Sequence, residues 1–314
     1  MTAILESRAL TKRYKDITAV EDLSFSIASG EIFSLLGPNG AGKTTTIAML
    51  STLLTPNSGD ALIGGHSILT EAMAVRRLIG IVPQDIALYP ELSAQENLLF
   101  WGRMYDLEGQ QLQERVAQTL ARIGLTERAK DRISTFSGGM KRRVNIAAGL
   151  LHHPRLLFMD EPTVGIDPQS RRAILDLVKE LNREGTSILY TTHYMEEAQE
   201  LSHRVGIIDH GKLIALGTQA ELTRQVGENS TLTLTVDEQD PMPALLEALR
   251  ALPEISQASA LANLLTLITP RAEAALAAVV TTLSNAGAHI RSVEVHAPNL
   301  ETVFLHLTGR ALRD

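Results

Sequence analysis

The sequence predicts an α/β fold with a mostly parallel sheet, followed by a smaller α+β domain. Three observations predict this. A strand pattern at residues 31–36 enters a glycine-rich loop and then a helical pattern. Four apolar residues at 156–159 precede two carboxylates, as in a central parallel strand that is covered on both faces. After residue 228, short patterns follow one another in the order β-α-β-β-α-β.

The composition is that of a globular protein with a sizeable core. Hydrophobic residues make up 44% and charged residues 21% of the 314 residues. The chain has no cysteine, which excludes disulfides and thiolate metal sites. Its formal net charge of −7 argues against nucleic acid as a partner. No apolar run reaches the ~20 residues of a membrane span, and charges between Glu6 and Arg13 argue against a signal peptide.

The first thirty residues favour β-structure. Residues 4–10 alternate imperfectly, whereas residues 19–27 alternate better and place Leu23, Phe25 and Ile27 on one face. Tyr14 is expected in the loop between these strands. It is either an ordinary edge aromatic or a ring that stacks on a base.

The loop after residues 31–36 fits the pattern G-x-x-x-x-G-K-[ST] and leads into a helix at 45–50. Its glycines let backbone N–H groups turn towards phosphate oxygens, and the helix N-terminus adds about half a positive charge. The pattern therefore predicts a phosphate site, the alternative being an ordinary glycine-rich turn. In it, the Lys43 ammonium would reach the β- and γ-phosphates and the Thr44 hydroxyl would bind Mg²⁺. The loop consists of Gly37, Pro38, Asn39, Gly40, Ala41, Gly42, Lys43, Thr44 and Thr45.

Residues 56–150 begin with a turn and short strands and continue as helices. Turn composition at 56–60 precedes strand patterns at 61–63 and 79–83, and the second of these is followed by Gln84. A lone glutamine at such a place has no meaning by itself. A capping-box pattern at 93–96 opens one helix, and residues 112–123 form a second, amphipathic one. We therefore expect a helical insert over residues 86–150.

A second potential anion site lies where Ser137, Gly138 and Gly139 precede a strongly helical pattern. The serine hydroxyl and consecutive backbone N–H groups would point from a helix N-terminus. Taken alone, the three residues are better explained as an ordinary N-cap.

The apolar strand ends in Asp160 and Glu161, at the edge where open α/β sheets bind ligands. Asp160 would hold the coordination sphere of Mg²⁺, and Glu161 would accept a proton from water. Another buried strand, at 187–192, ends at the same edge and is followed by His193. The alternative is a solvated acidic pair at a strand end.

In this order the motifs resemble those of the ATPase subunits of ABC transporters, over about residues 3–225. The resemblance implies an α/β P-loop ATPase core with an antiparallel N-terminal β-subdomain and a helical subdomain. It also implies ATP and Mg²⁺ as ligands. The motifs are the loop at 37–45, Gln84, the Ser-Gly-Gly signature at 137–139, the strand with its carboxylates at 156–161, an aspartate loop at 164–167 and His193.

The resemblance implies a role for each residue of the nucleotide site. Tyr14 would stack on adenine, and Thr44 and Gln84 would coordinate Mg²⁺. Glu161 would orient or deprotonate the attacking water. His193 would contact the γ-phosphate.

Other residues are implied to act between two copies of the chain. Ser137 and Gly139 would serve the nucleotide held by the other copy, and Asp167 would lie at the dimer interface. Three positions depart from the family pattern: Phe136 and Met140 replace the usual leucine and glutamine at the two ends of the signature, and Val164 replaces a serine.

The tail differs from the rest in charge and pattern. From residue 228 it has ten acidic and five basic residues and no lysine. We therefore predict an ATP-binding domain over 1–227 and an accessory or regulatory domain over 228–314. The strand and helix order of the tail predicts a ferredoxin-like unit. Its ending at 298–304 resembles the C-terminal extension of drug-resistance and antibiotic ABC exporters, which pair with a separate ABC-2-type permease.

The leading interpretation is a transport ATPase that dimerises, docks on membrane permease subunits at the cytoplasmic face of the cell membrane and drives export. An alternative is a soluble ABC ATPase that acts on nucleic acid or in cluster assembly. The single P-loop, the short helical insert and the acidic tail weigh against it. A P-loop kinase would leave the Ser-Gly-Gly signature unexplained.

Overall fold

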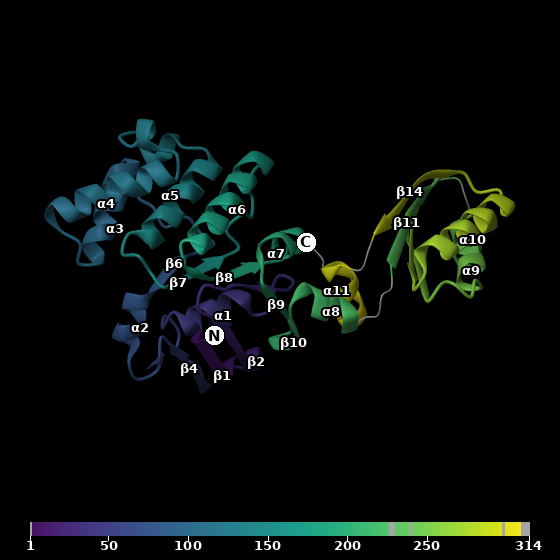
Figure 1. The fold of residues 1–314 in the computed structure, drawn as a ribbon, viewed down its shortest axis with the longest axis horizontal. Helices are drawn as coiled ribbons and strands as arrows, with labels where there is room; N and C mark the ends of the chain where they lie inside the picture. The colour runs from purple at the N-terminus through teal and green to yellow at the C-terminus, as the bar shows by residue number, and fades with distance from the viewer. Residues whose placement is uncertain (1, 226–229, 238, 240, 297–298, 309–314) are drawn as a thin grey trace. The chain divides into compact units, whose positions relative to one another are not determined.

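The computed structural model describes residues 2–225, 230–237, 239, 241–296 and 299–308 (Figure 1). The described residues divide into two compact units, one that ends at Leu216 and one that begins at Gly217. The predicted boundary between residues 227 and 228 falls outside the described residues and stays a prediction.

The first unit contains ten strands and seven α-helices among its described residues. The strands are β1 (Ala3–Tyr14), β2 (Ile17–Ala28), β3 (Ile32–Leu36), β4 (Ser58–Ile63), β5 (His66–Ser67), β6 (Ile79–Val82), β7 (Leu156–Asp160), β8 (Ser187–Thr192), β9 (Arg204–Asp209) and β10 (Lys212–Gly217). The helices are α1 (Lys43–Leu50), α2 (Ala72–Leu78), α3 (Ala94–Met104), α4 (Gly109–Arg122), α5 (Gly138–Leu150), α6 (Pro168–Arg183) and α7 (Met195–Leu201).

A six-stranded sheet with the order β10-β9-β3-β8-β7-β6 forms the centre of this unit. Neighbouring strands from β9 to β6 are parallel, and β10 follows β9 after two residues, as in a hairpin. The predicted parallel core is confirmed. Because parallel strands end at the same edge, the segments that follow β3, β6, β7 and β8 all lie there.

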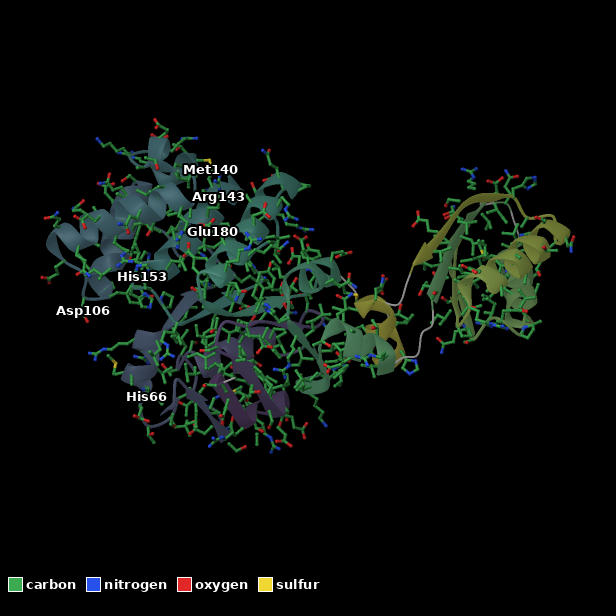
Figure 2. All side chains as sticks on the ribbon, in the orientation of Figure 1. His66, Asp106, Met140, Arg143, His153 and Glu180 are labelled. Atoms are coloured by element: carbon green, nitrogen blue, oxygen red, sulfur yellow. The ribbon has the colours of Figure 1, made fainter. Side chains whose placement is uncertain are left out.

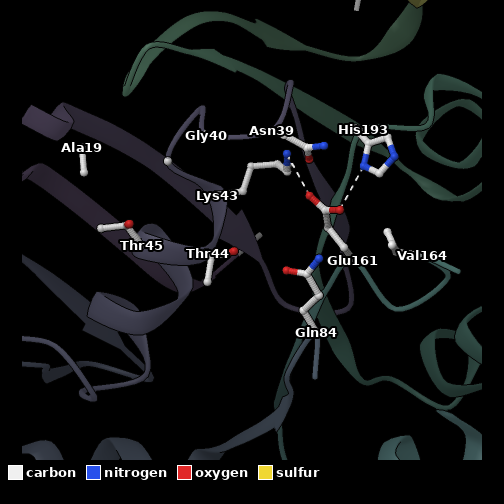
Figure 3. Close-up of a pocket in the computed structure, with 11 residues that line it drawn as sticks. Ala19, Asn39, Gly40, Lys43, Thr44, Thr45, Gln84, Glu161, Val164 and His193 are labelled. Atoms are coloured by element: carbon white, nitrogen blue, oxygen red, sulfur yellow. Dashed lines mark hydrogen bonds and ion pairs between the residues drawn. The ribbon is translucent and has the colours of Figure 1, made fainter. Parts of the chain in front are cut away.

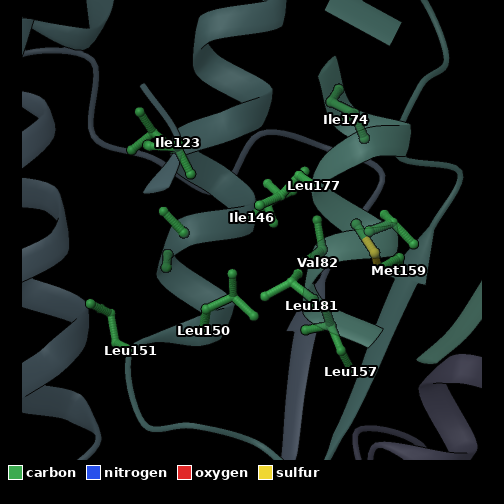
Figure 4. Close-up of a cluster of buried hydrophobic side chains, with 14 of the residues drawn as sticks. Val82, Ile123, Ile146, Leu150, Leu151, Leu157, Met159, Ile174, Leu177 and Leu181 are labelled. Carbon is green, nitrogen blue, oxygen red and sulfur yellow. The ribbon is translucent and has the colours of Figure 1, made fainter. Parts of the chain in front are cut away.

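The two faces of this sheet belong to two hydrophobic cores. In β7, Leu156 and Phe158 join the core beneath the N-terminal strands. Leu157 and Met159 join the core formed with the helices from α3 to α6 (Figure 4). All four side chains are fully buried. This explains the uninterrupted apolar run, since neither face of the strand meets water.

The N-terminal strands form the expected antiparallel sheet, with the order β2-β1-β4-β5. Two details of the prediction are wrong. Tyr14 is the last residue of β1, paired with Ile17, because the strands continue to a tighter turn than expected. The turn predicted at 56–60 is shorter, because β4 begins at Ser58 and pairs there with Thr11.

The segment expected to be helical contains α3, α4 and α5. The capping box at the start of α3 is confirmed: the Ser93 hydroxyl accepts from the Glu96 backbone N–H at 3.1 Å, and the Glu96 carboxylate accepts from the Ser93 N–H at 2.7 Å. Met140 of α5 is partly buried against the core of these helices (Figure 2).

The second unit contains a four-stranded antiparallel sheet with the order β12-β13-β11-β14, which is ferredoxin-like. Leucine and valine side chains of α9 and α10 are buried with Leu232 and Leu234 of the sheet. Helix α11 packs against α8. The elements are α8 (Gln219–Gln225), β11 (Ser230–Val236), α9 (Met242–Arg250), β12 (Gln257–Leu261), β13 (Leu264–Thr269), α10 (Ala272–Asn285), β14 (Ile290–His296) and α11 (Leu300–Thr308).

The contact between α8 and α11 predicts where the chain can be divided. A chain that ends at Gly217 keeps the whole of β10, whereas one that ends at residue 227 keeps α8 but loses α11. Both should melt cooperatively, because the first unit keeps its two cores. The longer one should bind more of an apolar dye, since Leu222 is fully buried in the intact chain. A large fall in Tm for both chains would contradict the division into two units.

Candidate functional site

A cavity of about 390 Å³ lies at the carboxyl edge of the central sheet (Figure 3). It brings together segments that follow β3, β6, β7 and β8, among them Glu161 and His193, which the sequence predicted for this edge. The lining residues are Ala19, Asn39, Gly40, Gly42, Lys43, Thr44, Thr45, Gln84, Glu161, Val164 and His193.

The loop between β3 and α1 requires glycine at two places. Gly42 has φ +106°, and a Cβ there would lie 2.5 Å from the Ala19 carbonyl oxygen. A Cβ on Gly37 would lie 2.2 Å from the Ile208 carbonyl oxygen. The loop therefore approaches neighbouring backbone too closely for any side chain. This tight turn delivers Lys43 to the cavity at the start of α1.

A buried ion pair occupies the middle of the cavity (Figure 3). The Lys43 Nζ lies 2.9 Å from Glu161 Oε1, and the two side chains are 3% and 6% exposed. The same Nζ donates to the carbonyl oxygens of Gly37 at 2.6 Å and Pro38 at 2.9 Å. A buried ammonium needs such partners in place of water, and these contacts fix its orientation.

Glu161 is held from three sides. Its Oε2 lies 2.9 Å from Nδ1 of His193, and its backbone N–H donates to the Thr191 hydroxyl at 3.0 Å. Its φ is +43°, a left-handed conformation that is costly for a residue with a side chain. The contacts with Lys43, Thr191 and His193 are what retain this conformation and aim the carboxylate into the cavity.

Asp160 lies beside the cavity without lining it. It is 3% exposed and accepts a hydrogen bond from the Thr191 hydroxyl at 2.7 Å. The same hydroxyl accepts from the Glu161 backbone, so Thr191 joins the two carboxylate residues. Nothing in the sequence pattern singled out Thr191.

Gln84 lines the cavity because α5 holds its backbone. The buried Arg142 guanidinium donates to the carbonyl oxygens of Pro83 at 2.8 Å and Gln84 at 2.6 Å. The Asn145 side chain accepts from the Ala87 N–H at 3.1 Å. Burial lowers the pKa of Arg142. The sequence did not single out Arg142, because its partners Pro83 and Gln84 lie 59 and 58 residues away along the chain.

Other predicted site residues lie outside this lining. Ser137 caps α5, and its hydroxyl accepts from the Met140 N–H at 3.3 Å. Asp167 caps α6 and accepts from the Ser170 N–H at 2.9 Å. The two helix starts touch, since a Cβ on Gly139 would lie 2.0 Å from the Ser170 hydroxyl. Gly37, Pro38, Ala41, Gly138 and Tyr14 are also absent from the lining.

Tyr14 is 47% exposed at the end of β1. The Lys12 ammonium lies 5.5 Å from the centroid of its ring. Ala19 of β2, which sequence reasoning missed, is the residue of the N-terminal strands that lines the cavity.

Comparison with known proteins agrees with this geometry. A sequence model of the ABC transporter family matches residues 20–164. The chain is 50% identical to the linearmycin resistance ATP-binding protein of Bacillus subtilis (strain 168), over 99% of this chain and 100% of that protein. It is 40% identical to the Nod factor export ATP-binding protein I of Cupriavidus metallidurans, over the full length of both chains.

Solved structures show the same fold. An ATP-binding subunit of an ABC transporter matches with a TM-score of 0.65 at 32% identity, over 71% of this chain and 92% of that one. A dimeric ATP-binding cassette with ADP and Pi, in a post-hydrolysis state, matches with a TM-score of 0.63 at 27% identity, over 68% and 98%. The chain therefore belongs to the ABC transporter family, as an ATP-binding subunit that hydrolyses ATP.

Proposed function

We propose that the chain drives the export of a drug, antibiotic or lipid-like compound through a separate membrane permease. The relatives named for linearmycin resistance and Nod factor export support export. The observation that supports hydrolysis at this site is the Glu161 carboxylate, which lies 2.9 Å from both Lys43 and His193 inside the cavity. The substrate of hydrolysis is ATP, bound along the loop from Gly37 to Thr45.

Phosphate binding would exchange one partner of Lys43 for another. In this structure the ammonium is paired with Glu161. The β- and γ-phosphates would take over that pairing, helped by the N–H groups at the start of α1. The exchange would release Glu161 for a second task in the same cavity.

The side chains present fit a magnesium ion. Mg²⁺ prefers oxygen donors and keeps several waters, and it is usually held together with substrate phosphates. The Thr44 hydroxyl and the Gln84 side chain both line the cavity. Within the described residues there is no cluster of three or more His, Asp or Glu that would hold a metal alone. Thr44 and Gln84 would be ligands, and Asp160 would act through a water; the ion would offset phosphate charge.

Glu161 would then accept a proton from the attacking water. The water oxygen forms a bond to the γ-phosphorus as the bond to the bridging oxygen breaks, and ADP leaves. His193 would contact the γ-phosphate while its Nδ1 stays close to Glu161. Tyr14 would stack on the adenine ring.

A second copy of the chain would complete each site. Ser137, Gly138, Gly139 and Asp167 lie at helix starts outside the cavity of their own chain. There they would contact the nucleotide held by a partner copy. The dimeric cassette with ADP and Pi supports this arrangement. We therefore infer a homodimer with shared sites.

The permease would place the chain on the cytoplasmic face of the cell membrane as a peripheral subunit. No described helix is long and apolar enough to span a bilayer. Residues 228–314 would act in assembly or regulation, with residues 1–227 as the ATP-binding domain. A pull-down from native membranes tests the proposal: a co-purifying integral membrane protein supports it, and its absence favours a soluble ABC ATPase.

Replacing Lys43 by alanine should weaken ATP binding by about 10–100-fold, because a charge-assisted contact contributes about 1.5–3 kcal/mol. Titration calorimetry measures this, with Lys179→Ala as a control, because Lys179 pairs with Glu200 on the surface. Unchanged affinity in Lys43→Ala would refute the phosphate role.

Replacing Glu161 by glutamine should retain or tighten ATP binding, because the competing partner of Lys43 loses its charge. Turnover should fall by about 10²–10⁴-fold, the usual effect of losing a general base. Steady-state phosphate release measures turnover, and the exposed Asp176→Asn is the control. Near-normal turnover in the Glu161 variant would show that another group is the base.

Mixing two inactive variants tests the shared site. One chain carries Lys43→Ala and the other carries Ser137→Arg, so each homodimer has both sites broken. In the mixed dimer, Lys43 of one chain and Ser137 of the other form one intact site. Some ATPase activity should therefore return.

Sedimentation of the Glu161→Gln chain with saturating Mg²⁺-ATP supplies the control. If this chain stays monomeric even with its permease, the shared-site proposal is wrong. If it dimerises and the mixed dimer stays inactive, the sites are shared but hydrolyse ATP only when both are intact.

A further inference from the structure

Glu197 of α7 is a carboxylate buried in the first unit, with 2% of its surface exposed. Its Oε1 accepts a hydrogen bond from the Thr163 hydroxyl at 2.6 Å. Its Oε2 accepts from the Tyr190 hydroxyl and the Thr192 hydroxyl, both at 2.9 Å. The Arg171 Nε lies 3.5 Å from Oε1. Three hydroxyl donors and one guanidinium therefore replace the water that this side chain has lost.

The partners of Glu197 remain able to donate. Burial, and next the neighbouring carboxylate, hold the pKa of Tyr190 well above its usual value. The Tyr190 hydroxyl therefore keeps its proton at physiological pH. Because the Thr163 and Thr192 hydroxyls do not ionise, all three hydroxyl groups remain hydrogen-bond donors.

One branch of this network leads to His193. The Thr192 hydroxyl donates to Glu197 and accepts from the Tyr194 backbone N–H at 2.9 Å. Thr192 and Tyr194, which flank His193, are thereby both linked to the Glu197 carboxylate. The Arg171 guanidinium also lies 4.2 Å over the Tyr194 ring, whose centroid is 4.2 Å from that of His193.

The other branch leads to the segment after Glu161. Thr163 is two residues beyond Glu161, and its side chain is 1% exposed. Arg171 belongs to the first turn of α6, where its N–H donates to the Asp167 carbonyl oxygen at 2.8 Å. The buried carboxylate thus contacts both ends of the segment from Thr163 to α6.

We propose that Glu197 is a positioning residue for ATP hydrolysis, which holds the turn around His193 and the segment from Thr163 to Asp167 in fixed register. This inference rests on the proposed roles of Glu161 and His193. The register matters because Glu161 comes two residues before Thr163 and its Oε2 is only 2.9 Å from Nδ1 of His193. A displacement of about 1 Å in such a contact can cost about 10²-fold in rate.

The test compares Glu197→Gln with Glu200→Gln in the full chain. Glutamine has the shape of glutamate, but its amide nitrogen cannot accept a hydrogen bond, so at least one of the three hydroxyl donors loses its acceptor. Glu200 lies one turn further along α7 and forms surface ion pairs with Arg172 and Lys179. We expect kcat of Glu197→Gln to fall about 10–100-fold. The KM for ATP should change little, because Glu197 and its three hydroxyl partners make no side-chain hydrogen bond to the loop from Gly37 to Thr45.

Two nearly isosteric variants separate the branches. Thr192→Val removes the donor beside His193, and Thr163→Val removes the donor after Glu161. Each should lower kcat with little change in KM. In a His193→Ala background, Glu197→Gln should lower kcat by less than it does in the wild-type chain, because part of its effect passes through His193.

Two outcomes would overturn the inference. In the first, Glu197→Gln and both valine variants have the same kcat as Glu200→Gln, whereas His193→Ala is inactive. That result would contradict the role of Glu197 and leave the proposed function intact. The other is a parallel loss of kcat, ATP affinity and Tm in Glu197→Gln, which would show a purely structural role. Full turnover in His193→Ala would instead refute the proposed role of His193, and with it this branch.

Discussion

Two charged side chains are buried away from water at the carboxyl edge of the sheet, and the rest of the structure depends on keeping them paired. Lys43 and Glu161 are both buried, so each needs a partner at all times. In this structure they satisfy each other. Any anion that enters must therefore be able to replace a carboxylate against an ammonium, which a phosphate group can do. The cavity therefore favours an anionic ligand that can take the place of Glu161 as the partner of Lys43.

The supporting contacts follow from the same constraint. Thr191 joins Asp160 to the backbone of Glu161, and Arg142 holds the backbone beside Gln84. Neither Thr191 nor Arg142 lines the cavity. Thr191 fixes Glu161, which lines it, and Asp160, which lies beside it. Arg142 fixes Gln84, which also lines it. A chain that buries charges in this way needs many such hydrogen bonds, because a buried polar group left without a partner costs about 1–3 kcal/mol.

Most of the fold could be predicted from local patterns. The strands of the parallel core were recognisable because both faces are buried, and the start of α3 because its capping box is a sequence feature. Helices α6 and α7 and the hairpin of β9 and β10 were not predicted. The order of strands and helices in the tail was sufficient to predict the ferredoxin-like sheet of the second unit.

The site was predictable only as far as its residues follow strand ends. Lys43, Glu161 and His193 could be found because each comes directly after a buried strand or its loop. Glu197 and Arg142 could not, because they lie inside helices and their partners are distant in sequence. Long-range hydrogen bonds leave no local pattern, so the residues that position a site are harder to find than those that form it.

The strand order has a further consequence for the dimensions of the site. Strands β3, β8 and β7 are immediate neighbours, and they precede Lys43, His193 and Glu161 respectively. Adjacent strands lie about 4.8 Å apart, so the outer two are separated by about 10 Å. Backbone hydrogen bonds, not side chains, set that width. The pairing of the strands therefore fixes the distance between the ends of β3 and β7. Substitutions in the loops can change what the cavity binds, but this distance stays constant for as long as the strands remain paired.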